Sequence, residues 1–490
     1  MTHSLRAIAG AAVLALAGTA AATPTFVNGL VLDAAALDLS GGSTVNTGRL
    51  GYFSDIYYDN NRQQWWGLSD RGPGGGTLDY APRMQRFSVD VNNATGEISN
   101  FKVLQTVVFS QADGSSFNGK APALNGVLGN SLDPEGLVVN PRSGNFLVSD
   151  EYGPSLLEFD RSGQLVKRYS VPANLVPKVG TATDYNTVPP TLNHGREVNR
   201  GLEGLAISPN GKYAFAMLQN GTLDDGYNFG TASRGNYTRI VKYDTDTGQA
   251  VGQYAYMLQS AGQGRGISAL VAVNDHQFLL LGRNNRGVGV PNANLASPDK
   301  KVYLIDLANA TDVSAIALNN AGTGFTAASK SSTAFIDLAA AGSLQAALGG
   351  VSPEKWEGLA IGPKLADGSY LMLAGTDNDY SVTQNGSGTQ FDVYIKPGSG
   401  TVSRIQCDIG SFNNCLQIAT DGSVSGAVAA NFDSSGYTLV PAVLNAYKAS
   451  ASDLAAYLAP VPEPASWALL VGCLIGLLGL GALSRRQAAR

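Results

Sequence analysis

A glutamate and a glycine open an apolar, strand-like run three times in this chain. The three stretches read EGLV at residues 135–138, EGLAI at 203–207 and EGLAI at 357–361. Each is followed by a turn and then by a second apolar run that ends in polar residues. Self-similarity of this kind indicates a fold assembled from copies of one small structural unit.

The second copy shows the unit most clearly. Its apolar runs at 135–139, 146–149, 156–159 and 164–171 are separated by short polar stretches, two of which end in glycine. Glycine, asparagine and aspartate tolerate the positive φ angles that tight hairpins need. The chain holds 59 glycines and only 14% charged residues, which suits many short strands joined by turns. We therefore expect each copy to be a four-stranded antiparallel sheet.

Five such units can be aligned, which predicts an all-β fold of the β-propeller type, with blades arranged around a channel. The fourth copy is expected to end in a strand at 313–317, and the fifth to take its outer strands from 391–395 and 402–407. We predict six blades, the sixth formed by 26–39 with part of 416–440. These assignments give a propeller domain over 26–445 and an alanine-rich linker over 446–460.

Both ends of the chain have the pattern of targeting segments. Arg6, an apolar run at 8–17 and small residues at 20–22 predict a secretory signal peptide over 1–22. Residues 465–483 contain no charge, and as a helix they would span about 28 Å, close to the thickness of a bilayer's hydrocarbon core. Arg485 and Arg486 follow at once, which favours a cytoplasmic C-terminus and an inner-membrane helix.

Residues 461–490 as a whole resemble the PEP-CTERM sorting signal, on the strength of Pro462-Glu463-Pro464, the apolar span and the terminal arginines. The resemblance implies a Gram-negative bacterium, processing by an exosortase as a partner, and a final place at the cell surface or in the extracellular matrix. An ordinary single-span anchor is the alternative.

The cysteines of the exported body form one close pair. Cys407 and Cys415 bracket the stretch CDIGSFNNC. In an exported protein such a pair predicts a local disulfide. The spacing is not CxxC, which argues against a redox site.

Propeller topology gives the repeated glutamate a place. The first strand of each blade lines the channel and the second runs back beside it, so the start of strand one and the end of strand two meet at one mouth. We expect that rim to carry Glu135, Glu203 and Glu357 from strand starts, and Asp70, Arg71, Asp150, Glu151, Gln219, Arg283, Asn284, Asp377, Asn378 and Asp379 from strand ends. So many carboxylates cannot all stay ionised unless arginines or a metal ion offset their charge.

These residue types predict a metal-assisted site for an anionic ester. Oxygen ligands favour Ca²⁺ as the cofactor, and three histidines are too few to suggest zinc. A bound cation would polarise ester oxygens, a rim carboxylate would act as general base, and arginines would hold the anion. We assign catalysis to Glu203, Glu135 and Glu357, substrate binding to Arg71, Arg200 and Arg283, and metal binding to Asp70, Asp150, Glu151, Asp377 and Asp379.

Several stretches resemble the phytase-like family, described as "esterase-like activity of phytase". They are LSDRGPGG (68–75), DPEGLVV (133–139), FLVSDEYGPSLLEFD (146–160), NRGLEGLAISPNGKYAFAMLQ (199–219), PEKWEGLAIG (353–362) and TDNDYS (376–381). The resemblance covers roughly residues 50–400 and implies a propeller-type domain that hydrolyses phosphate or carboxylic esters. The fourth copy departs from it, because Gly282 stands where an acidic residue is expected.

Three alternatives stay open. The repeated glutamates can instead accept hydrogen bonds from backbone N–H groups of the next blade and so lock the ring. The propeller can be a non-catalytic binding module of an exopolysaccharide matrix, with a polysaccharide-associated small molecule as its ligand. It can also be a lactonase-type calcium propeller acting on carboxylic esters. The net charge of −5 argues against nucleic acid as the partner.

Overall fold

The chain is built almost entirely of β-strands. The computed structural model describes residues 23–41, 48–124, 126–226, 235–290, 293–385, 387–429 and 431–461. In these ranges the helices are the short 3₁₀ turns η1 (Ala341–Ser343), η2 (Ala346–Leu348) and η3 (Asp379–Ser381), so the all-β prediction is confirmed. None of these helices is long and apolar enough to cross a membrane. The predicted signal peptide and the predicted span at 465–483 lie outside the described residues.

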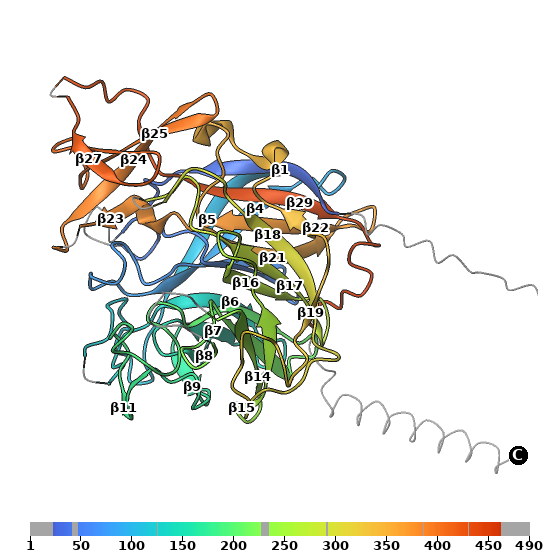
Figure 1. Cartoon of the computed structure of the whole chain (residues 1–490). Helices are drawn as coiled ribbons and strands as arrows, with labels where there is room; N and C mark the ends of the chain where they lie inside the picture. The colour runs from blue at the N-terminus through green and yellow to red at the C-terminus, as the bar shows by residue number, and fades with distance from the viewer. Residues whose placement is uncertain are drawn as a thin grey trace, which may run out of the picture.

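Four sheets follow the chain in order, each with its strands in sequence (Figure 1). Blade one contains β2 (Asp55–Asp59), β3 (Gln64–Leu68), β4 (Arg83–Val91) and β5 (Ile98–Val108). Blade two contains β6 (Pro134–Val139), β7 (Phe146–Asp150), β8 (Ser155–Phe159) and β9 (Leu165–Arg168). Blade three contains β12 (Leu202–Ile207), β13 (Tyr213–Leu218), β14 (Tyr237–Asp244) and β15 (Gln249–Met257). Blade four contains β16 (Gly266–Ala272), β17 (Gln277–Arg283) and β18 (Lys300–Asp306), with β19 (Ser329–Lys330) and β20 (Ile336–Asp337) both paired to β18.

The fifth blade joins the two ends of the described chain. It contains β21 (Trp356–Lys364), β22 (Tyr370–Thr376), β29 (Ala442–Ala449) and β1 (Thr25–Leu32), in that order from the channel outward. Figure 1 shows blue β1 beside red β29. The predicted outer strands of this blade are therefore wrong, and the predicted linker over 446–460 begins inside β29.

The five blades close into a ring. The innermost strands contact one another in the cycle β2, β6, β12, β16, β21 and back to β2. Apolar clusters fill the space between neighbouring blades, as Trp66 of blade one with Phe146 of blade two illustrates at 4.7 Å between ring centroids. The predicted sixth blade is wrong, because the 26–39 segment supplies β1 to blade five.

The rest of the predicted sixth blade belongs to a separate sheet inserted between β22 and β29. It contains β23 (Val382–Gln384), β24 (Gln390–Gly398), β25 (Thr401–Asp408), β26 (Leu416–Ile418), β27 (Val424–Ala427) and β28 (Thr438–Leu439). We call it the inserted sheet; it projects at the upper left of Figure 1. Cys407 and Cys415 form a disulfide within it. A two-stranded ribbon, β10 (Lys178–Val179) with β11 (Ala182–Thr183), completes the described sheets.

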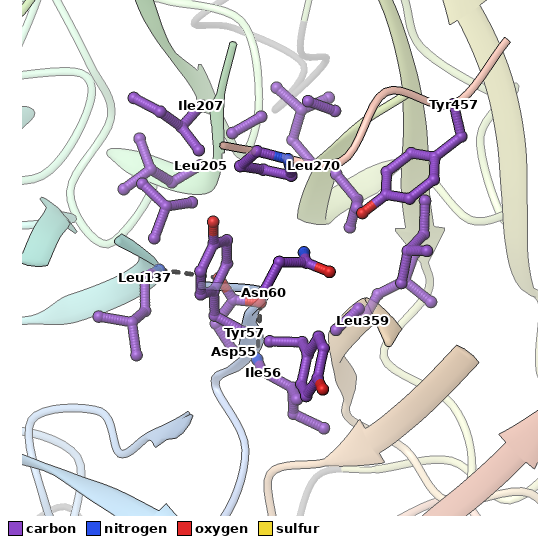
Figure 2. A pocket seen from close by; sticks show the side chains of 18 residues that line it. Asp55, Ile56, Tyr57, Asn60, Leu137, Leu205, Ile207, Leu270, Leu359 and Tyr457 are labelled. Atoms are coloured by element: carbon purple, nitrogen blue, oxygen red, sulfur yellow. Dashed lines mark hydrogen bonds between the residues drawn. The ribbon is translucent and has the colours of Figure 1, made fainter. Parts of the chain in front are cut away.

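The described end of the chain lies at one mouth of the channel. A cavity of about 40 Å³ there is lined mainly by apolar residues of all five inner strands, together with Asp55, Asn60, Tyr457 and Pro460 (Figure 2). The Leu458 N–H donates to the Val273 carbonyl (2.8 Å), and the Val461 N–H donates to the Pro209 carbonyl (3.0 Å). Both acceptors lie beyond the C-terminal ends of inner strands, opposite the strand starts that carry the repeated glutamates.

Candidate functional site

Each repeated glutamate lies at a break in strand pairing. The register between the inner and second strands shifts between Pro134 and Gly136, between Leu202 and Leu205, and between Trp356 and Gly358. An extra residue of this kind re-aims a side chain, and such bulges are common beside active sites. In blade four the same shift occurs between Ile267 and Ala269 and spans Ser268. The repeated motif therefore encodes a bulge as well as a charge.

These bulges and the ends of the second strands form one polar site, which we call the acidic mouth. Its carboxylates are Asp70, Asp133, Glu135, Glu151, Glu203, Glu354, Glu357, Asp377 and Asp379. The cationic side chains among or directly beneath them are Arg71, Arg196, Arg200, Arg283, Lys300 and Lys355. In the part of the chain that the structure describes, acidic groups therefore outnumber basic ones in the mouth.

One cluster in the mouth brings together Asp133, Glu135 and Glu151. One oxygen from each lies within 4.8 Å of the other two, and all three residues are buried. The Arg71 guanidinium approaches this first cluster from blade one, with its Nη1 2.5 Å from Asp133 Oδ2 and 3.8 Å from Glu151 Oε2. It also donates to the Asn199 side chain.

Several carboxylate oxygens of the mouth have no hydrogen-bond donor among the described residues. They are Glu151 Oε1, Glu203 Oε2 and Glu357 Oε2, and each is buried. The other oxygen of Glu203 accepts from Gln219 Nε2, and Gln219 Oε1 in turn accepts from Arg200. A buried carboxylate oxygen without a donor is costly, which indicates that a cation or a proton completes this site.

A second cluster brings together Asp70, Asp377 and Asp379, whose oxygens also lie within 4.8 Å of one another. Lys355 fills it: its Nζ lies 2.7 Å from Asp377 Oδ2 and 2.7 Å from Asp379 Oδ1. Lys355 directly precedes β21, so the strand that carries Glu357 also carries this cation.

Blade four contributes cations in place of a glutamate. Arg283 donates to Glu357 of blade five, lies 4.0 Å from Glu354, and donates to Ser268 at the bulge (3.0 Å). Beneath it, the Lys300 ammonium donates to the Asn284 carbonyl. Burial and the neighbouring Arg283 lower the pKa of Lys300 to about 7.

The pKa values of the mouth follow from burial among like charges. Burial and the neighbouring carboxylates raise the pKa of Glu135 and Glu203 well above the usual range. Burial raises the pKa of Glu151 to about 7, with Asp133 adding to the shift and Arg71 opposing it. Burial likewise raises the pKa of Asp70 to about 7, against the pull of Lys355. Protons are therefore retained near neutral pH where no other cation is bound.

The predicted site residues have different outcomes. Glu135, Glu203, Glu357, Glu151, Asp70, Asp377, Asp379, Arg71, Arg200 and Arg283 all lie in the mouth. Asp150 does not act as an open ligand, because its oxygens accept from the backbone N–H groups of Asp133, Tyr152 and Gly153 and from the Ser155 hydroxyl. Arg71 and Arg283 form ion pairs with carboxylates of the mouth. The positive charge that was predicted to hold an anionic substrate is therefore neutralised at these two arginines by the protein's own carboxylates.

The blade-locking role belongs to a different carboxylate. Asp55, in the inner strand of blade one, accepts from the Leu137 N–H of blade two at 2.8 Å. None of the hydrogen bonds found among the described residues joins Glu135, Glu203 or Glu357 side chains to the backbone of another blade.

Five charged residues of the mouth were missed in the sequence: Asp133, Glu354, Lys355, Arg196 and Lys300. Asp133 and Lys355 each lie two residues before a repeated glutamate, and Glu354 lies three before. Aligning the motif leftward from the glutamate would have shown charged residues at this position in two copies. Their identity differs between copies, which is why a search for one repeated residue overlooked them.

Comparison with known proteins places most of this chain in one family. A model of the phytase-like family, "esterase-like activity of phytase", matches residues 48–380. The chain belongs to the phytase-like family. The match contains both clusters of the acidic mouth and ends where the inserted sheet begins.

Other similarities of this phytase-like chain are more distant. It is 26% identical over 208 residues to an uncharacterized secreted protein of Arthroderma benhamiae, covering 33% of this chain and 40% of that one. This chain thus spans less than half of that relative. A streptogramin B lyase structure is 11% identical and covers 86% of this chain and 98% of its own, with a TM-score of 0.29. A β-propeller domain of Myceliophteria thermophila is 12% identical and covers 80% and 90%, with a TM-score of 0.29.

Proposed function

We propose that this protein is an exported hydrolase of phosphate or carboxylic esters, whose site is the acidic mouth with one divalent cation bound at the first cluster. The observation that carries the proposal is the buried Glu151 oxygen without a donor in the first cluster, together with the two further such oxygens that Glu203 and Glu357 contribute to the mouth. Carboxylate oxygens alone suit Ca²⁺, and Glu135 and Glu151 with Asp133 would hold it.

The ion would supply positive charge that polarises the ester and acidifies an attacking water. Glu203 is the residue we assign as general base. Its carboxylate is held on one oxygen by Gln219, which leaves the other oxygen open to receive a proton. Burial and the neighbouring carboxylates raise its pKa, which makes it a stronger base than an exposed glutamate. Tyr457 and Pro460 lie at the far mouth of the channel, so the ester would enter from the acidic side.

Export and sorting form part of the same proposal. The secreted relative and the targeting patterns at 1–22 and 461–490 support a route out of the cell, with exosortase processing at the C-terminal signal. Extracellular calcium modules bind Ca²⁺ with dissociation constants up to the order of 10⁻³ M. A surface location would expose the mouth to Ca²⁺ in that concentration range.

The test restores Ca²⁺ to chelator-treated protein and follows thermal unfolding together with hydrolysis of p-nitrophenyl phosphate and p-nitrophenyl acetate. We expect Ca²⁺ to raise the melting temperature and turnover, and Glu203→Gln to lower turnover about 100-fold or more. Glu158→Gln is the matched control, since Glu158 is buried outside the mouth. Cleavage of acetate alone would select the lactonase alternative. No response to Ca²⁺ in either assay would refute the proposal and favour the non-catalytic binding module.

A further inference from the structure

The two acidic clusters of the mouth are similar in composition but differ in what lies between their oxygens. Each contains three carboxylates whose oxygens lie within 4.8 Å of one another. In the first, the Arg71 side chain is hydrogen-bonded to just one of the three carboxylates, that of Asp133, and Glu151 keeps an oxygen without a donor. In the second, a lysine ammonium lies directly between two of the three carboxylates.

The position of that ammonium is close to the one a metal ion would take. Lys355 Nζ is 2.7 Å from oxygens of both Asp377 and Asp379, while Ca²⁺ binds oxygens at about 2.3–2.6 Å. Glu357 lies 3.9 Å from the same nitrogen and has a second, buried oxygen without a donor. A cation and the ammonium cannot occupy this space together.

The protein holds the ammonium there at some cost to its backbone. Asp379, Tyr380 and Ser381 have φ angles of 47°, 55° and 58°, the left-handed region that residues with side chains rarely adopt. This turn brings Asp379 to Lys355, and the Asp379 N–H donates to Asp377 (2.8 Å). Strain of this kind persists where the surrounding structure fixes it, often at functional sites.

We propose that Lys355 is a built-in cation that replaces a second metal ion, so that the acidic mouth takes up one divalent ion and not two. The inference rests on the proposed function for the first ion only. Two of the three N–H groups of Lys355 are bound to Asp377 and Asp379, and the third is available for an oxygen of the substrate. Lys355 is therefore a specificity-determining residue, which offers a fixed positive charge beside the exchangeable one.

The test is calorimetric titration of Ca²⁺ into chelator-treated protein. We expect one equivalent for the wild-type protein, two for Lys355→Ala, and one for Lys355→Arg, which keeps the cation. Lys448→Ala is the control. The Lys448 ammonium forms an ion pair with Asp367 at 2.7 Å, and this pair lies outside the mouth. We also expect Ca²⁺ to raise the melting temperature of Lys355→Ala more than that of the wild type, since it would replace a lost internal charge.

The outcomes separate this inference from the proposed function. Two equivalents bound by the wild-type protein overturn the inference, and this result does not depend on whether Lys355→Ala folds. Equal stoichiometry in wild type and a folded Lys355→Ala also overturns it. If the wild type binds none and Lys355→Ala binds one, the role of Lys355 stands and the proposed ion at the first cluster fails.

Discussion

The glycine of each repeated glutamate–glycine pair has a packing role that explains why the two residues recur together. A Cβ added at Gly136 would lie 2.6 Å from the Glu203 carbonyl oxygen and 2.6 Å from Leu205 Cβ of the next blade. At Gly204 it would lie 2.8 Å from the backbone nitrogen of Leu270, again in the next blade. The glycine thus lets neighbouring inner strands approach, while the glutamate before it faces the mouth.

Gly136→Ala should therefore lower the free energy of unfolding by about 1–3 kcal/mol, because the added methyl overpacks a rigid contact between two blades. Chemical denaturation measures this effect. Gly426→Ala serves as the control, since a Cβ there meets nothing within 4 Å and the position has no positive φ. An unchanged stability for Gly136→Ala would contradict the packing role assigned to the motif.

At the scale of elements, the inserted sheet supports the mouth although it lies beyond the family match. Asp392 in β24 binds Arg49 at 2.8 Å, and Arg49 donates to the Tyr380 carbonyl at 2.9 Å in the left-handed turn. Asn378 and Ser381 donate to the Val440 carbonyl just after β28. The turn that brings Asp379 to Lys355 is therefore clamped from the inserted sheet.

Asp392→Ala should cost about 3–5 kcal/mol of unfolding free energy, because it leaves the Arg49 guanidinium buried without its partner. Asp79→Ala, which removes an exposed pair with Lys120 at 3.5 Å, should cost about 0–1 kcal/mol. Urea titration of both variants gives the comparison. Similar losses for the two would show that the clamp adds nothing to stability.

Local patterns predicted the elements well wherever a blade is continuous in sequence. Blades two and three match the expected strands closely, since hairpin turns such as 160–163 fix their pairing locally. Blade five could not be predicted in this way, because β22 pairs with β29 across the inserted sheet and β29 pairs with β1 at the other end of the chain. The strands at 391–395 and 402–407 do pair with each other, so the predicted hairpin is confirmed. Its predicted assignment to blade five is wrong, because both strands belong to the inserted sheet.

The candidate site shows the same division. The shared mouth followed from topology alone, because strand direction decides which ends meet. The pairing of Lys355 with Asp377 and Asp379 could not be predicted from topology. It depends on a left-handed turn at 379–381, and none of these three residues is a glycine that would have signalled such a turn. The sequence therefore predicted most of the charged residues that gather in the mouth. Which of them form ion pairs with one another depends on tertiary packing and could not be predicted.

For the whole molecule, the excess of carboxylates in the mouth couples stability to pH. Burial raises the pKa of Asp70 and Glu151 to about 7 and that of Asp150 to about 6, all above their values in an unfolded chain. Between about pH 4 and pH 7 the folded state thus binds more protons than the unfolded state, and its stability falls as pH rises. Above pH 7, Lys300 acts in the opposite direction, since burial lowers its pKa to about 7.

Chelator-treated protein should therefore melt at a lower temperature at pH 7 than at pH 5. Added Ca²⁺ should reduce this difference, because the ion stabilises the ionised carboxylates that the proton would otherwise neutralise. Differential scanning calorimetry at the two pH values, with and without Ca²⁺, makes the measurement. A metal-free protein that is more stable at pH 7 would be inconsistent with buried, proton-retaining carboxylates.

The place of the described chain end at the far mouth also determines how the molecule is oriented with respect to anything joined to its C-terminal side. The Val461 N–H is bonded to the Pro209 carbonyl on the face opposite the acidic mouth, so the described part of the chain ends on that face. A propeller tethered there would point its open end outward. Solutes would then reach the carboxylates from the bulk medium, without passing through the layer in which the tether is fixed.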